Sequence, residues 1–395
     1  MISTRAGQTA LTVSDSSTSR GDTTGRVHYD LFDTLRIAAS LLVVYFHSYA
    51  LTGHADPVVP LFGRAGLGYG SIAVGAFFAM SGFMVTASWS RSSPPVFARN
   101  RIARIYPGII AVVVLSTFVV GPLVSQVSPS SYFKQGLTWS YLVHTSSLFP
   151  VLYHLPGVFA HNPYPTAVNG SLWTLTYEVS AYVCLAALGI VGLLRPRSIL
   201  VVLGATAVLD VLAIQFDVIH QHTFHSFTVV DSVSLALFFE IGAACYLYRG
   251  LALGHRRISG ALVVAAIVGG GLARSQALMS VGIGVGVVLI GSMPSQPARS
   301  LRRLGDPSYG IYIYAFVIQQ MLAWGHVTRS PLVMFALASL ASVAAGYASW
   351  HLIEGPVMDW AKNRFPATAR GRVQRNVDQP PLVQTSAGTS TPDLR

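Results

Sequence analysis

Long apolar stretches restrict this chain's fold more than any other feature. They recur along most of the 395 residues, and each is close to the roughly 20 residues that a helix needs to cross a hydrocarbon core of about 30 Å. Hydrophobic residues make up 52% of the chain and charged residues 10%, whereas a soluble domain carries about a quarter charged residues. The sequence therefore predicts an all-α membrane protein.

The apolar stretches predict about ten transmembrane helices in one bundle. Residues 30–360 form the transmembrane domain, and polar segments at 1–29 and 361–395 are predicted to be disordered cytoplasmic tails. The spans are expected near residues 31–52, 71–89, 104–124, 171–194, 198–215, 231–248, 257–273, 276–293, 308–325 and 331–352.

The distribution of basic residues sets the orientation. With both termini in the cytoplasm, 21 of the 26 Lys and Arg residues fall on the cytoplasmic side and four on the opposite side, as the positive-inside rule requires. The net charge of +11 is thereby explained by topology, so we expect a lipid bilayer and no nucleic acid as partner.

The first span holds two ionisable side chains, Arg36 and His47. Eleven residues at 100° each place them on nearly the same face, about 16 Å apart along the helix. An arginine for phosphate near the cytoplasmic end and an imidazole for proton transfer further out suit a thioester donor. Alternatively, Arg36 snorkels to the headgroups and His47 is a satisfied core histidine.

Further polar groups follow in the third and fourth spans. Arg101 and Arg104 are one helical turn apart and can face one anion, although a basic loop there also fits simple topology. Glu178 shares a helix face with Ser171 and Thr174. We expect Glu178 at the depth of His47, where its carboxylate can hold the imidazole in one tautomer.

Glu240 is a second carboxylate within a span, where a hydrogen-bonded helix contact explains it best. His220, His222 and His225 lie together in an exterior loop, and a solvated loop explains them better than a metal site. We therefore predict no metal ion.

Six motifs occur in order along residues 30–360. They are Asp-x-Leu-Arg…His in the first span, Phe-Phe-x-x-Ser-Gly-Phe with Ser81, Arg-x-x-Arg-Ile-Tyr-Pro, Asn-Gly-Ser-Leu-Trp-x-Leu-x-x-Glu with Trp173, Ser-Tyr-Gly-Ile-Tyr with Tyr309, and His-Leu-Ile-Glu-Gly-Pro. Together they resemble the bacterial acyltransferase-3 family of membrane O-acyltransferases.

The resemblance implies an enzyme of the bacterial cytoplasmic membrane. It would move an acyl group, commonly acetyl, from cytoplasmic acyl-CoA to a hydroxyl of a glycan or glycosylated compound, without a permanently bound cofactor. His47 matches the family's essential histidine, and Glu178 the carboxylate of the fourth helix. Arg36, Arg101 and Arg104 match its arginines, which we assign to the donor phosphates. The chain departs from the family at Ala315, where many members have a second histidine.

Two expectations concern the acceptor and an alternative function. The long exterior segment 125–170 has aromatic residues suited to sugar rings and is predicted to cover the acceptor; the alternative is a lid that merely seals the bundle. Its aromatic residues include Trp139, Tyr141, Phe149 and Tyr153. The alternative function is a transporter or flippase in which His47 and Glu178 relay protons.

Overall fold

The computed structural model describes residues 29, 31–165, 167–215, 223–224 and 227–364. Nearly all of them are helical, and the strands β1 (Thr223–Phe224) and β2 (Phe227–Thr228) form one short antiparallel pair. The predicted all-α membrane fold is thus confirmed. Most of the two predicted tails and His220, His222 and His225 lie outside the described residues.

Every predicted span corresponds to a helix. The helices are α1 (Leu31–Leu51), α3 (Tyr69–Trp89), α4 (Pro94–Leu115), α8 (Trp173–Ile190), α9 (Pro196–Gln215), α10 (Val229–Leu247), α12 (Arg256–Ala273), α13 (Gln276–Gly291), α15 (Ser308–Trp324) and α16 (Pro331–Ser349). The shorter helices are α2 (Pro60–Gly63), α5 (Gly121–Val124), α6 (Pro129–Lys134), α7 (Gly136–Ser140), α11 (Arg249–Gly254), α14 (Gln296–Arg302) and α17 (Gly355–Arg364).

Eight helical segments of the described chain are long and apolar enough to cross a membrane. Of the ten predicted spans, α13, with 16 residues, and α15, with 17, are shorter than this. At 1.5 Å per residue, each is about 25 Å long, somewhat less than a hydrocarbon core.

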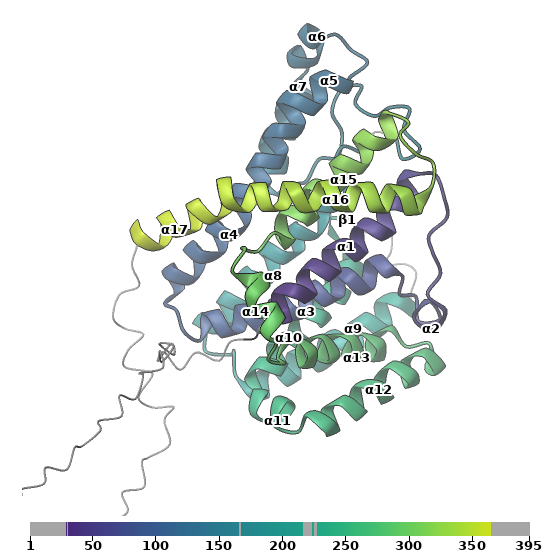
Figure 1. The fold of residues 1–395 in the computed structure, drawn as a ribbon. Coiled ribbons are helices and arrows are strands. Elements are labelled where there is room, and N and C mark those ends of the chain that lie inside the picture. The colour runs from purple at the N-terminus through teal and green to yellow at the C-terminus, as the bar shows by residue number, and fades with distance from the viewer. Residues whose placement is uncertain (1–28, 30, 166, 216–222, 225–226, 365–395) are drawn as a thin grey trace, which may run out of the picture.

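Two of the long spans continue through a wider π-helical turn. Ser116–Val120 joins α4 to α5, and Trp350–Glu354 joins α16 to α17. Figure 1 shows α16 and α17 as one long rod. The extra residue in such a turn changes the direction of the side chains that follow it, and here it accompanies a carboxylate, Glu354, that is fully buried.

The centre of the bundle is the contact between α3 and α10, the two most buried spans. Gly82 faces the carbonyl oxygen of Phe239, and Gly242 faces the carbonyl oxygen of Ala79. A Cβ atom on either glycine would lie 1.9 Å from that oxygen. Glycine at these two positions therefore lets the backbones touch, as is common between membrane helices.

Helix α1 lies beside α15, and the two run in the same direction (Figure 1). Ser40 Oγ donates a hydrogen bond to the carbonyl oxygen of Ser308. Further along both helices, Gln319 Nε2 donates to the carbonyl oxygen of Val44 and to Ser48 Oγ. These bonds set the register between α1 and α15, and so the level of each residue on α1.

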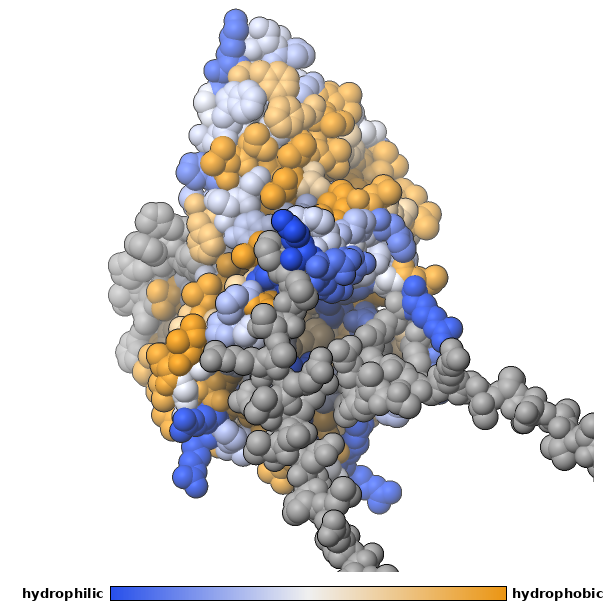
Figure 2. All heavy atoms as spheres, turned by 90° about the vertical axis from the view of Figure 1, so that its left-hand side faces the viewer, coloured by the Kyte–Doolittle hydropathy of each residue, from blue (hydrophilic) through white to orange (hydrophobic). Residues whose placement is uncertain are grey.

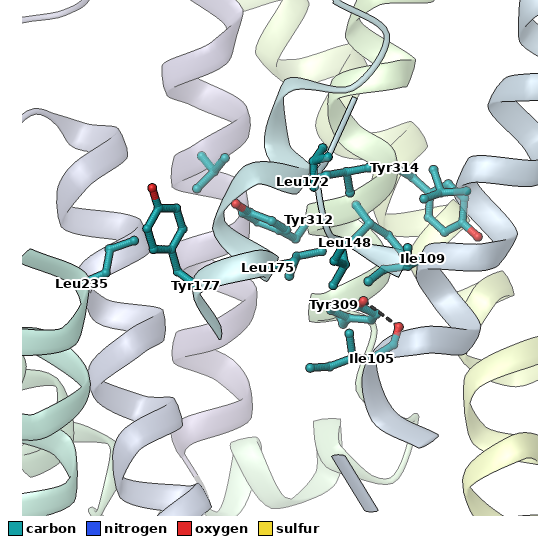
Figure 3. Close-up of a cluster of buried hydrophobic side chains, with 14 of the residues drawn as sticks. Ile105, Ile109, Leu148, Leu172, Leu175, Tyr177, Leu235, Tyr309, Tyr312 and Tyr314 are labelled. Carbon is teal, nitrogen blue, oxygen red and sulfur yellow. Dashed lines mark hydrogen bonds between the residues drawn. The ribbon is translucent and has the colours of Figure 1, made fainter. Parts of the chain in front are cut away.

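The segment 125–165 packs into the bundle. Tyr132 Oη donates to the carbonyl oxygen of Thr117, Asn162 Nδ2 donates to Gln320, and Leu148 is buried among Ile109, Leu172 and Leu175 (Figure 3). Of its four named aromatic residues, Tyr141 is fully buried, whereas Trp139 and Phe149 are 45% and 44% exposed. Much of this segment therefore belongs to the core.

Candidate active site

A cavity of about 310 Å³ lies between α1, α3, α4, α8, α15 and α17. Six of the predicted site residues line it: Arg36, Ser81, Arg101, Arg104, Glu178 and Tyr309. Figure 2 views the molecule from the side where α17 and the start of α4 lie, and hydrophilic residues gather at the middle of that face. The structure therefore brings together residues from motifs that are far apart in the sequence.

Two of the three arginines in the cavity share one carboxylate, Asp306. Its Oδ2 lies 2.7 Å from Arg36 Nη1 and 2.6 Å from Arg104 Nη2. The other oxygen accepts hydrogen bonds from the amide and hydroxyl of Ser308. Burial alone would raise the pKa of Asp306, but the two guanidinium groups and the Ser308 bonds outweigh it and hold the pKa well below its usual range.

Arg104 also faces the buried carboxylate of Glu354, with Nη1 3.7 Å from Oε2. Ser349 Oγ donates to the other oxygen of Glu354. The guanidinium of Arg104 stacks over the rings of Tyr309 and Trp350. Arg36, Arg104, Asp306 and Glu354 together form what we call the charge cluster, in which the two positive charges are balanced by two negative ones.

Sequence reasoning did not assign a role to Asp306 or Glu354. Both stand at recognised motifs: Asp306 comes two residues before Ser-Tyr-Gly-Ile-Tyr, and Glu354 is the acidic residue of His-Leu-Ile-Glu-Gly-Pro. A buried charge needs a partner of opposite sign. Asking which acidic residues could pair with Arg36 and Arg104 would have found them.

Arg101 differs from the other two arginines. Its guanidinium lies 6.0 Å from the ring centroid of Phe97 and 5.7 Å from that of Tyr182. Within the described part of the chain it forms no ion pair, and its buried Nε has no hydrogen-bond partner. Arg101 is therefore the arginine of this cavity whose charge is available to an incoming anion.

Glu178 takes part in a small hydrogen-bonded group with Ser81 and Tyr182. Tyr182 Oη and Ser81 Oγ both donate to Glu178 Oε1, the latter over 3.3 Å. The hydroxyls of Ser81 and Tyr182 are themselves 3.0 Å apart. The guanidinium of Arg101 lies over the ring of Tyr182. One wall of the cavity is therefore formed by the carboxylate of Glu178, the hydroxyls of Ser81 and Tyr182, and the unpaired Arg101.

His47 lies apart from this group and does not line the cavity. Its ring packs edge-on against Phe316, with centroids 5.1 Å apart, and at a tilt against Phe46. It forms no hydrogen bond with any residue that the structure describes. The imidazole therefore has both nitrogens free for a substrate.

The predicted contact between His47 and Glu178 is not present. Thr174, one turn before Glu178, bonds to Tyr312, whereas His47 contacts Phe316, one turn further along α15. The two residues are thus about two helical turns, or about 11 Å, apart in depth. The prediction of similar depth is wrong because it assumed that each helix runs perpendicular to the membrane and begins and ends where the sequence predicts.

Trp173 and Tyr309 have structural contacts in this arrangement. The ring of Trp173 packs edge-on against Tyr177 and does not line the cavity. Tyr309 Oη donates to the carbonyl oxygen of Ile105 (Figure 3). That bond ties α15 to α4 and helps to hold Arg104 beside Asp306.

These features define a class: a multi-span membrane protein with a polar, charge-lined cavity among its helices. The family model of the acyltransferase-3 family, described as an acyltransferase domain, matches residues 29–351. The chain belongs to this family and is a membrane O-acyltransferase.

Two known proteins are similar to this chain over most of their length. An O-acetyl transferase of Shigella phage Sf6 is 26% identical over 338 residues, which cover 82% of this chain and 94% of the phage protein. Nodulation protein 10 of Rhizobium leguminosarum bv. viciae is 27% identical over 358 residues, which cover 84% of this chain and 94% of the nodulation protein. No solved structure gives a significant match. The match to an acyltransferase favours the enzyme over the transporter.

Proposed function

We propose that the protein transfers an acetyl group from cytoplasmic acyl-CoA to a hydroxyl of a glycan or glycosylated compound on the exterior side of the bacterial cytoplasmic membrane. The observation that carries this proposal is the cavity, which has arginines at one end and extends among Ser81, Glu178 and Tyr312. A donor with anionic phosphates and a long, uncharged thioester arm has this distribution of charge.

Arg101 is the residue that we assign to the donor phosphates. It lines the cavity and its charge is unpaired, whereas Arg36 and Arg104 are already balanced by Asp306 and Glu354. Lys362 also lines the cavity, and its ion pair with Asp359 is exposed to solvent. An exposed ion pair contributes little to stability. Lys362 can therefore turn to an anion at small cost.

The thioester would lie near Tyr312, at the end of the cavity away from the arginines. This residue is one helical turn before Phe316, the contact of His47 on α15. Glu178, Ser81 and Tyr182 would then line the path of the pantetheine arm. Their oxygen atoms can hydrogen-bond its amides.

His47 would act as the general base for the acceptor. It would remove the proton of the acceptor hydroxyl as that oxygen attacks the thioester carbonyl. A carbon–oxygen bond forms and the carbon–sulfur bond breaks. The sulfur of CoA takes up the proton that His47 removed, so CoA leaves as the thiol and the imidazole becomes neutral again. The acceptor would approach past Phe316, which also contacts Tyr164 of the segment 125–165.

The test uses purified protein in liposomes with acetyl-CoA labelled in the acetyl group. Release of free CoA thiol, together with label on an added glycan fraction that is absent with His47→Ala, would support the proposal. Solute uptake without CoA release would contradict it. Sidedness is tested by adding acetyl-CoA to right-side-out and inside-out membrane vesicles, because only the inside-out vesicles should then use it.

A further inference from the structure

A second cavity, of about 260 Å³, lies beside the first. Its lining is mainly apolar and comes from α8 and α10, with single residues of α3, α9 and the turn between α8 and α9: among others Leu185, Leu188, Ile199, Leu235, Ala236 and Phe239. The carboxylate in the lining, Glu240, accepts a hydrogen bond from Thr206. The two cavities lie on opposite faces of α8. Figure 3 shows Tyr177 and Leu235, which line the second cavity, on one side, and Leu175 and Tyr312, which line the first, on the other.

Of the described residues that line either cavity, Phe78 alone borders both. It is 4% exposed, so its ring fills the space between them. Its neighbour Phe77 packs against Tyr312, with ring centroids 5.7 Å apart. Phe78 therefore stands at the level of Tyr312, which is where the proposed function puts the thioester and its acyl group.

We propose that Phe78 limits the length of the transferred acyl group by closing the first cavity off from the second. This inference rests on acyl-CoA being the donor. An acetyl group ends after one methyl carbon and needs no space beyond the ring. A longer acyl chain meets the ring of Phe78, and the second cavity lies behind that ring.

The size of the expected change in donor preference follows from the burial of methylene groups. Each methylene moved from water into an apolar cavity contributes about a fourfold factor in binding. Hexanoyl has four more carbons than acetyl, so a cavity that admits even half of them should favour it by at least tenfold. The bonds that form and break are the same for every acyl group, and only the chain at the carbonyl carbon differs.

The experiment compares acetyl-, butyryl-, hexanoyl- and octanoyl-CoA with the wild type and Phe78→Ala, measuring CoA release and the mass of the acylated acceptor. We expect Phe78→Ala to raise kcat/KM for hexanoyl-CoA relative to acetyl-CoA by at least tenfold. Leu188→Ala is the matched control, because it enlarges the second cavity without opening it, and should leave that ratio unchanged. Adding Ala236→Leu to Phe78→Ala should shorten the preferred chain again.

An unchanged ratio in a folded, active Phe78→Ala protein would overturn the inference, as would loss of transfer with every donor. Lipid retained in the second cavity by that protein, detected by native mass spectrometry, would then assign the cavity to a bilayer lipid instead. If Phe78→Ala does not yield a monodisperse protein, Phe78→Leu is tested in the same way. Failure of the wild type to use any acyl-CoA would contradict the proposed function itself, which separates the two results.

Discussion

Replacing Asp306 by asparagine tests the charge cluster most directly. The substitution keeps the size of the side chain and one carbonyl oxygen but removes the negative charge. Arg36 and Arg104 would then be two neighbouring cations, and among the described residues Glu354, 3.7 Å from Arg104, would be left to balance them. We expect the variant to be less stable and, at the same time, to bind an anionic donor more tightly.

The expected loss of stability in Asp306→Asn can be worked out from two contacts. Asp306 accepts charge-assisted hydrogen bonds of 2.7 and 2.6 Å, and such bonds contribute about 1.5–3 kcal/mol each. The side chains are 13–18% exposed, so water reaches them, and asparagine still accepts one bond. Both facts reduce the loss to about 2–4 kcal/mol of unfolding free energy, which lowers the melting temperature by about 5 °C or more.

The melting temperature can be followed with a thiol-reactive dye. Cys245 is buried and Cys184 is exposed, so in a Cys184→Ser background the dye reports the exposure of Cys245 on unfolding. The control is Asp359→Asn, which removes the exposed pair with Lys362 and should change stability by less than about 1 kcal/mol.

The effect of pH gives a second check. Because the pKa of Asp306 is lowered in the folded protein, its contribution is present above the unfolded pKa of about 4 and is lost only as pH falls further. The loss of stability in Asp306→Asn, relative to the wild type, should therefore be the same at pH 6 and pH 8. A variant as stable as Asp359→Asn, or a deficit that disappears by pH 6, would refute the reasoning.

The other predictions concern the site and the bundle. His47→Ala should insert and melt normally yet lose transfer, measured as CoA release, because no other described imidazole contacts Phe316. Arg101→Ala should raise the donor KM by tenfold or more with little change in melting temperature. A lost contact to phosphate costs about 1.5–3 kcal/mol, whereas among the described residues the guanidinium forms no ion pair and only lies over the rings of Phe97 and Tyr182. Gly82→Ala should abolish stable folding, seen as aggregation in size-exclusion chromatography, because its Cβ would lie 1.9 Å from a carbonyl oxygen.

Each of these has an opposite result that would contradict it. Near-normal turnover of His47→Ala would remove the imidazole from the chemistry. A donor KM unchanged by Arg101→Ala but raised by Arg36→Ala would mean that the paired arginines bind the phosphates. A monodisperse, active Gly82→Ala protein would show that α3 and α10 can separate without loss of the fold.

The sequence alone was enough to predict the membrane class, the place of each long helix and most of the charged residues that line the cavity. Apolar length is a local property, because a helix in lipid satisfies its backbone within itself. The motifs likewise pointed to Arg101, Arg104, Ser81 and Glu178, all of which line the cavity. The spacing of Arg36 and His47 predicted a shared face, and both do face α15 or the residues that lead into it.

Only the tertiary structure decided which charges meet. Asp306 joins arginines that are 270 and 202 residues away, and Glu178 bonds to Ser81, 97 residues away, instead of His47. Spacing along one helix gives the direction of a side chain, but its depth depends on the tilt and register of that helix against its neighbours. Those are set by contacts between helices, such as Gly82 on Phe239 and Ser40 on Ser308, which no single segment contains.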